Sequence, residues 1–129
     1  MPLGNPMGED FVYSDEGLPI GIFMGTVRVS SLEQALTFYR DLLGMEIVKT
    51  LVGRAILSCG EQMLMLRESS PELIGGETGL YLATKSIYDL HARLVDEGVI
   101  FVQPPLRDEV GLTAIVVDDD GNILTFIEP

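Results

Sequence analysis

The 129-residue chain has one cysteine, one histidine and no tryptophan, and these shortages exclude several kinds of site. The single Cys59 excludes an intramolecular disulfide and a zinc site made of cysteines. With only His91, no pair of histidines can chelate a metal, and the spacing gives no support to a Ser-His-Asp arrangement. A lone cysteine fits a reducing compartment, so we expect a cytoplasmic protein.

Long apolar runs and nucleotide-binding motifs are also absent. No stretch reaches the roughly 18 to 20 apolar residues that a membrane-spanning helix needs, and the first residues lack the pattern of a signal peptide, so we expect none. There is no G-x-x-x-x-G-K or G-x-G-x-x-G sequence for a nucleotide. The net charge of −12 disfavours nucleic acid and anionic membranes as partners. The charge either only keeps the protein soluble or attracts a cationic small molecule.

The residues that are present form a repeated pattern of elements. Residues 22–30 alternate apolar and polar side chains, which predicts a strand. Residues 31–44 predict a helix that begins at the N-cap Ser31 and ends at Gly44. Three short strands separated by glycines complete this first half.

The second half repeats that order. Residues 78–85 predict a strand, and a helix is expected from Ser86 to Gly98, again followed by three strands. Each half therefore contains strand, helix, strand, strand and strand, a repeat of about 55 residues. We expect an α+β fold of two βαβββ modules, whose mixed sheets form a cup with the helices outside.

One domain is predicted after an N-terminal arm. The arm covers residues 1–21, is rich in glycine, proline and acids, and has one short strand near residues 11–13. The domain divides into module one, a linker and module two, at residues 22–68, 69–77 and 78–129.

Three segments resemble the vicinal oxygen chelate superfamily, which includes glyoxalases, bleomycin-resistance proteins and extradiol dioxygenases. Residues 29–48 (VSSLEQALTFYRDLLGMEIV) are similar to the family's first helix, with its Phe-Tyr and Leu-Gly pairs. Residues 55–66 (AILSCGEQMLML) resemble a strand pair of dioxygenase-like members. Residues 118–129 (DDDGNILTFIEP) resemble the terminal hairpin, with Asp119 in place of the usual proline. The resemblance covers residues 22–129 and implies the two-module fold and a homodimer.

Members of this family that use a metal take His, Gln or Glu ligands from four strand positions facing the cup. The resemblance places these positions at Met24, Met65, Gly79 and Thr125. None of the four is a usual ligand of a hard or borderline divalent cation, so we expect no metal and no other cofactor. A shift of register by one residue would instead bring Glu68 or Glu128 to the cup and turn every neighbour to the other face.

The acidic residues 118–120 allow two interpretations. Before Gly121 and Asn122 they are typical of a hairpin turn, in which aspartate side chains accept hydrogen bonds from backbone amides. A calcium site is the alternative, but the run lacks the spaced ligands of an EF-hand loop. We expect the turn.

Strand alternation predicts which side chains line the cup, because Val27 and Val29 belong against the helices. The predicted lining is Met24, Thr26, Arg28, Met63, Met65, Arg67, Tyr81 and Thr125. Apolar walls with a few polar groups suit a small organic ligand. The two arginines either bind a carboxylate or phosphate, or reach the rim and pair with surface acids. The acidic surface favours a cationic ligand and the arginines an anionic one, so the charge of the ligand stays open.

Four functions fit these residues. The first hypothesis is metal-free binding of a small organic molecule, as in the drug-sequestering members that the sequence resembles. The second is a metal-dependent lyase, isomerase or dioxygenase that uses the shifted register. The others are a metal-free enzyme in which Tyr81 or Arg28 polarises a substrate, and a domain whose acidic surface contacts a protein. Metal content separates the first two.

Overall fold

The structure, a computed structural model, describes residues 16–129, so the strand expected near residues 11–13 lies outside the described residues. Module one contains β1 (Met24–Val29), α1 (Leu32–Leu36), the π-helical segment η2 (Thr37–Leu42), β2 (Glu46–Leu51), β3 (Arg54–Cys59) and β4 (Gln62–Glu68). After the 3-10 turn η3 (Pro71–Leu73), module two contains β5 (Gly76–Ala83), α2 (Ile87–Asp96), β6 (Ile100–Arg107), β7 (Leu112–Val117) and β8 (Asn122–Glu128).

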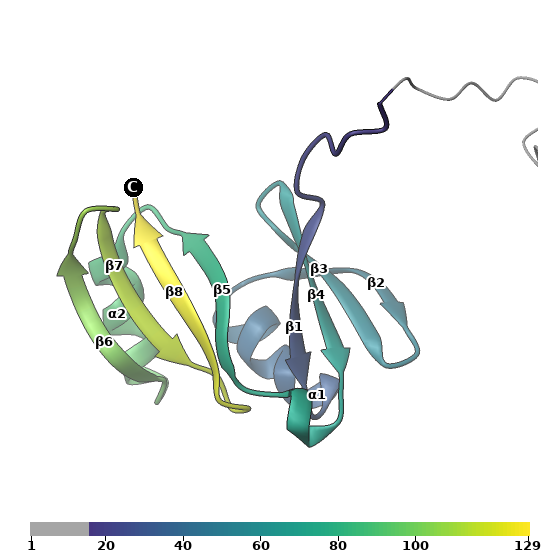
Figure 1. Cartoon of the computed structure of the whole chain (residues 1–129). Coiled ribbons are helices and arrows are strands. Elements are labelled where there is room, and N and C mark those ends of the chain that lie inside the picture. The colour runs from purple at the N-terminus through teal and green to yellow at the C-terminus, as the bar shows by residue number, and fades with distance from the viewer. Residues whose placement is uncertain (1–15) are drawn as a thin grey trace, which may run out of the picture.

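Each module forms one four-stranded mixed sheet. The strand orders are β1-β4-β3-β2 and β5-β8-β7-β6, and the first strand of each module runs parallel to its last. The sheets stand side by side with the helices behind them, so Figure 1 looks onto their open faces. The predicted fold of two βαβββ modules is confirmed.

None of the helices in residues 16–129 is long and apolar enough to cross a membrane.

Both helices begin where the sequence predicts. Each is also capped by a glutamate side chain at the end of a strand. The side chains of Ser31 and Ser86 each accept a hydrogen bond from the third backbone amide of their helix. Glu68, the last residue of β4, accepts a hydrogen bond from the first backbone N–H of α1 at 3.0 Å. Glu128, the last residue of β8, does the same for α2 at 2.9 Å. The two glutamates therefore serve the same purpose in both modules, because the first amides of a helix have no partner within it.

The first helix departs from the single α-helix expected up to Gly44. The α-helical part ends at Leu36, and the chain continues as a π-helix. The amide of Leu43 donates to the carbonyl oxygen of Phe38 at 3.0 Å, five residues back. The side chains of Phe38 and its neighbour Tyr39 are both buried, and their rings meet edge to face at 4.9 Å. A hydrogen bond that spans five residues is that of a π-helix, whereas an α-helix closes its hydrogen bonds over four.

The hydrophobic core lies between the sheets and the helices and is continuous across both modules. It includes Leu57 and Leu66 of module one and Leu94 and Val116 of module two. The predicted helix-facing residues of β1 and β4 are buried there. Burial of these apolar side chains is the main term that stabilises the fold.

The turn between β7 and β8 is confirmed, and it also binds module one. The Oδ1 atom of Asp118 accepts hydrogen bonds from the amides of Asp120 and Asn122, both at 2.9 Å. Its Oδ2 atom accepts one from the hydroxyl of Tyr39 at 2.6 Å. Asp120 accepts one from the hydroxyl of Ser30 at 2.7 Å, and the Asn122 side chain donates to a backbone carbonyl of β1 at 2.9 Å. We call Asp118, Asp120 and Asn122 the clasp, because together they join the modules.

The burial of Tyr39 makes the stability of the folded protein sensitive to alkaline pH. Its side chain is fully buried, and burial, reinforced by the charge of Asp118, raises the pKa of Tyr39 well above the ordinary 10.0. Above about pH 10 the unfolded chain releases this proton while the folded protein keeps it. We therefore expect the free energy of unfolding to fall with rising pH, by about 1.4 kcal/mol per pH unit from this group.

Urea unfolding from about pH 9 to about pH 11 measures this slope. The Tyr39→Phe variant is expected to lose this contribution, whereas Tyr88→Phe, at an exposed tyrosine of α2, keeps it. The same slope in wild type and Tyr39→Phe would contradict the assignment.

Candidate ligand-binding cup

The strand register arranges the open face of module one in rows. β4 lies between β1 and β3, and paired positions of the three strands point to the same face. From one end to the other the rows are Met24, Met63 and Ser58; then Thr26, Met65 and Ile56; then Arg28, Arg67 and Arg54. We call them the methionine row, the middle row and the arginine row. Successive rows are about 7 Å apart, the length of two residues in a strand.

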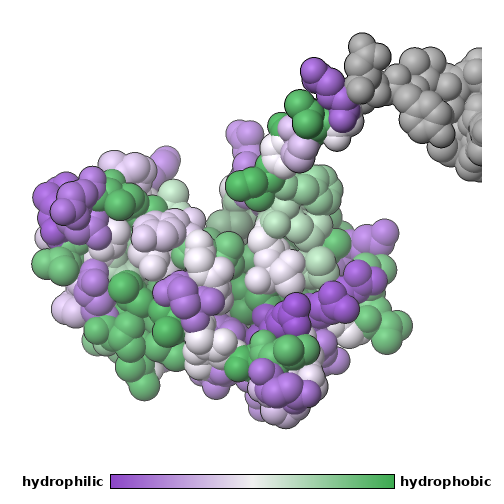
Figure 2. Space-filling view, viewed as in Figure 1, coloured by the Kyte–Doolittle hydropathy of each residue, from purple (hydrophilic) through white to green (hydrophobic). Residues whose placement is uncertain are grey.

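The arginine row brings three cations together on neighbouring strands. Arg28 pairs with Arg67 and Arg67 with Arg54, and all three are exposed. Within residues 16–129 the only ion pair is the one between Arg40 and Asp41. Neither Arg28 nor Arg67 therefore forms an ion pair with an acid of residues 16–129. Figure 2 shows a band of strongly hydrophilic side chains across the right-hand module.

The methionine row borders a cavity of about 470 Å³ between β1 and β5. Met24 and Met63 line it from module one and Tyr81, which is 56% exposed, lines it from module two. A notch between the two modules is visible at the top of Figure 2. Behind it the modules pack tightly, since a Cβ atom on Gly25 would lie 2.8 Å from the side chain of Leu80.

The open face of module two contributes less surface than predicted. Tyr81 pairs with Thr125, and Thr125 pairs with Ile115, so these three form a row across β5, β8 and β7. Thr125 is only 7% exposed, so it lies on the predicted face but offers a ligand little contact. Of the predicted module-one residues, Thr26 and Arg28 also line a smaller cavity of about 210 Å³ near the start of β5.

The four positions that the family resemblance assigns to metal ligands do not fit a metal. Met24 and Met65 lie on β1 and β4, Gly79 has no side chain, and Thr125 is nearly buried. Among residues 16–129, no group of three or more His, Cys, Asp and Glu side chains is placed to hold a metal ion.

The shifted register that would bring glutamates into the cup is wrong. Thr26 pairs with Met65, which leaves the next side chains along both strands on the helix side. Glu68 and Glu128 accept hydrogen bonds from the first amides of α1 and α2. Both carboxylates are therefore engaged away from the cup.

Two candidates for chemistry remain, His91 and Cys59. His91 lies in the middle of α2 and is half-buried, and its ring meets Phe101 edge to face at 4.6 Å, as expected for a helix histidine outside the cup. Cys59 is half-buried at the end of β3. Burial raises the pKa of the Cys59 thiol, which disfavours the reactive thiolate.

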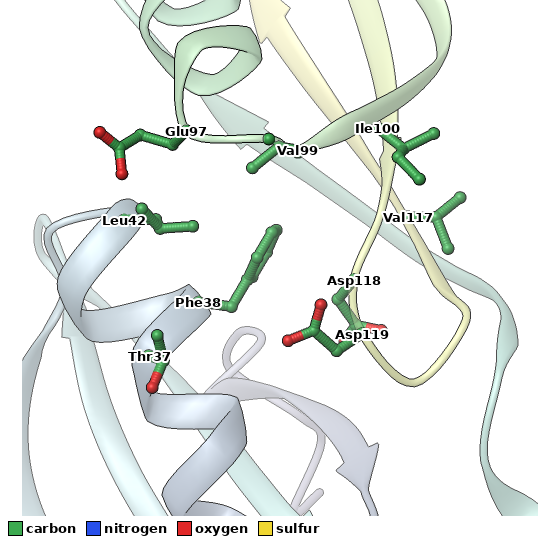
Figure 3. Close-up of a pocket in the computed structure, with 10 residues that line it drawn as sticks. Thr37, Phe38, Leu42, Glu97, Val99, Ile100, Val117, Asp118 and Asp119 are labelled. Carbon is green, nitrogen blue, oxygen red and sulfur yellow. The ribbon is translucent and has the colours of Figure 1, made fainter.

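A second cavity, on the helix side, was not found from the sequence. It measures about 590 Å³, and Figure 3 shows Phe38 reaching from η2 toward the connection between α2 and β6, with Asp118 and Asp119 beside it. Glu97 adds a third carboxylate, and the described residues that line this cavity include no basic side chain. The Asp118 carboxylate already accepts four hydrogen bonds in the clasp. The cavity forms only where the two modules meet, so no local sequence pattern marks it.

The sequence matches a family model, and the fold matches solved structures. The model of the Glyoxalase/Bleomycin resistance protein/Dioxygenase superfamily matches residues 21–126. No curated protein sequence matches the chain.

Three solved structures illustrate the likeness. A member of the same superfamily from Sphaerobacter thermophilus is 26% identical, with 84% of this chain and 97% of the other covered and a TM-score of 0.71. TnmS3, an antibiotic-binding protein from Streptomyces sp. CB03234, is also 26% identical, with 87% and 98% covered and a TM-score of 0.74. A lactoylglutathione lyase from Agrobacterium tumefaciens is 21% identical, with 85% and 94% covered and a TM-score of 0.70, and shares the fold.

Proposed function

The chain belongs to the glyoxalase/bleomycin resistance protein/dioxygenase superfamily, and from this premise we propose that its cup binds a small organic molecule without a metal. One observation carries the proposal. Met24 and Met63 of the methionine row line a cavity of about 470 Å³, a size typical of small-molecule sites, and Met65 and Ile56 of the middle row continue the same face with adaptable apolar side chains. The proposed contacts are Met24, Thr26, Arg28, Met63, Met65, Arg67, Tyr81 and Thr125.

The side chains of the cup support binding without a metal. Thioethers are soft ligands, and neither glycine nor a nearly buried threonine supplies the His, Glu or Asp donors that a catalytic divalent cation requires. The likeness to the antibiotic-binding protein TnmS3 supports the binding of a small organic molecule. A metal-dependent lyase, isomerase or dioxygenase would need Glu68 or Glu128 to leave its helix cap.

A titration with the neutral fluorescent probe N-phenyl-1-naphthylamine tests this proposal. We expect its fluorescence to rise on binding, with the same dissociation constant before and after treatment with a chelator. Elemental analysis of the protein should find no stoichiometric metal, and added zinc, nickel, manganese or iron(II) should leave the melting temperature unchanged. Probe binding that is lost on chelation and restored by one of these metals would contradict metal-free binding.

We also propose how the chain is organised and assembled. We propose that the chain consists of four parts: an arm (1–21), module one (22–68), a linker (69–77) and module two (78–129). A homodimer is supported by the edge strand β6, whose Ile100 and Val102 side chains are 70% and 58% exposed. A cytoplasmic location is consistent with the single cysteine.

A further inference from the structure

We propose that the ligand of the cup is an organic anion, with its acid group on the arginine row and its apolar body on the methionine and middle rows. This inference rests on the small-molecule binding proposed above and specifies the class of ligand. Carboxylates, phosphates and sulfonates share the chemistry that the row would recognise.

The first step is the concentration of positive charge on one face. The chain has only eight basic residues, and four of them lie on the open face of module one. Three form the arginine row, and Lys49 pairs with Ile56 of the middle row. Like charges directly opposite one another on neighbouring strands destabilise a sheet. A bound anion would remove this repulsion.

The second step is that no acidic side chain of the described residues neutralises the row. Glu68 follows Arg67 in β4, but it caps α1 on the opposite face of the sheet. Glu77 lines the small cavity beside Arg28, where it accepts a hydrogen bond from the amide of Gly79 at 2.8 Å and forms no ion pair. The guanidinium groups of the row thus keep their hydrogen-bond donors available to a ligand.

The third step concerns the negative charge of the whole protein. The net charge of −12 acts at long range, and salt screens it beyond about 8 Å. A ligand bound on the face meets the guanidinium groups at hydrogen-bond distance, about 3 Å, which is much shorter than this screening length. Local attraction therefore decides which charge is bound inside the cup.

The spacing of the rows defines the shape of the ligand. The middle row is about 7 Å from the arginine row and the methionine row about 13 Å. An acid group held by the arginines would therefore lie at one end of an apolar body about one or two aromatic rings long. The Met65 and Ile56 side chains would contact the near part of that body, and Met24 and Met63 the far part.

Two dyes that differ by one acid group test the inference. 8-Anilinonaphthalene-1-sulfonate carries a sulfonate on the skeleton of N-phenyl-1-naphthylamine, which is neutral. We expect the anionic dye to bind the wild-type protein more tightly. Arg67→Gln, at the centre of the row, should weaken its binding about tenfold, the loss of one charge-assisted hydrogen bond, and weaken binding of the neutral dye much less.

Arg107→Gln is the matched control. It removes the same charge from an exposed arginine of β6 that pairs with the core residue Leu112, outside the cup. Binding of both dyes to this variant should equal that of the wild type, and melting scans check that both variants stay folded. Benzoate and phenyl phosphate, added as competitors, tell carboxylates and phosphates apart by which one displaces the anionic dye at the lower concentration.

The results distinguish a failure of the anion site from a failure of the small-molecule binding on which it rests. If the neutral dye binds and Arg67→Gln changes neither dissociation constant, the anion site is wrong and small-molecule binding stands. An equal loss of anionic-dye binding in both arginine variants would also contradict the site, because only net charge would then matter. If neither dye binds the wild-type protein, the binding function itself fails.

Discussion

Replacing Asp118 by alanine is expected to lower the free energy of unfolding by about 3 kcal/mol, as several buried donors lose their acceptor. The Asp118 carboxylate is 7% exposed and accepts hydrogen bonds from the Tyr39 hydroxyl, from the Asn122 side chain and from two turn amides. Without it the turn and the junction between the modules weaken together. Chemical denaturation of wild type and variant measures the difference.

Asp119→Ala provides the control for that experiment. Asp119 is the next residue, carries the same charge and is exposed, so its loss should change stability by less than about 0.5 kcal/mol. If the two alanine variants were equally stable, the run of aspartates would be only a solvated turn and the clasp would not join the modules.

Introducing a carboxylate at the centre of the cup should have the largest effect on binding. Met65→Glu places a charge in the middle row, where it would lose its hydration when an apolar ligand covers it. We expect the affinity for N-phenyl-1-naphthylamine to fall by more than about tenfold, which corresponds to about 1.4 kcal/mol. The melting temperature should stay close to that of the wild type, because Met65 is not fully buried.

Val110→Glu adds the same charge in the turn between β6 and β7, away from the cup. Val110 is 61% exposed, so this variant should bind the dye like the wild type. Equal affinities of Met65→Glu and wild type would exclude the middle row as the binding surface.

Much of the fold followed from local patterns in the sequence. Alternation in β1 and β4 correctly placed Val27 and Leu66 against the helices, because a strand turns successive side chains to opposite faces. The helix starts at Ser31 and Ser86 were also predicted correctly, since capping depends on neighbouring residues. The π-helix was not, because its residues have the spacing of an ordinary amphipathic helix.

The parts that sequence reasoning missed depend on contacts between distant residues. Arg54 joins Arg28 and Arg67 only through the register of β3 on β4, and no single-strand pattern contains that information. The clasp is equally non-local, since Tyr39 and Asp118 are 79 residues apart. Alternation placed Thr125 on the right face, but it could not predict how little of the side chain would remain exposed.

Methionine methyl NMR during a titration with N-phenyl-1-naphthylamine tests the central claim, ligand binding in the cup, most directly. Met24, Met63 and Met65 lie on the open face of module one, and Met45, at 5% exposure in the core, is an internal reference. With carbon-13 in the methionine methyl groups, we predict that the signals of the three cup methionines shift in proportion to dye binding while that of Met45 stays in place. Bound dye that leaves all three cup signals unchanged would contradict the claim.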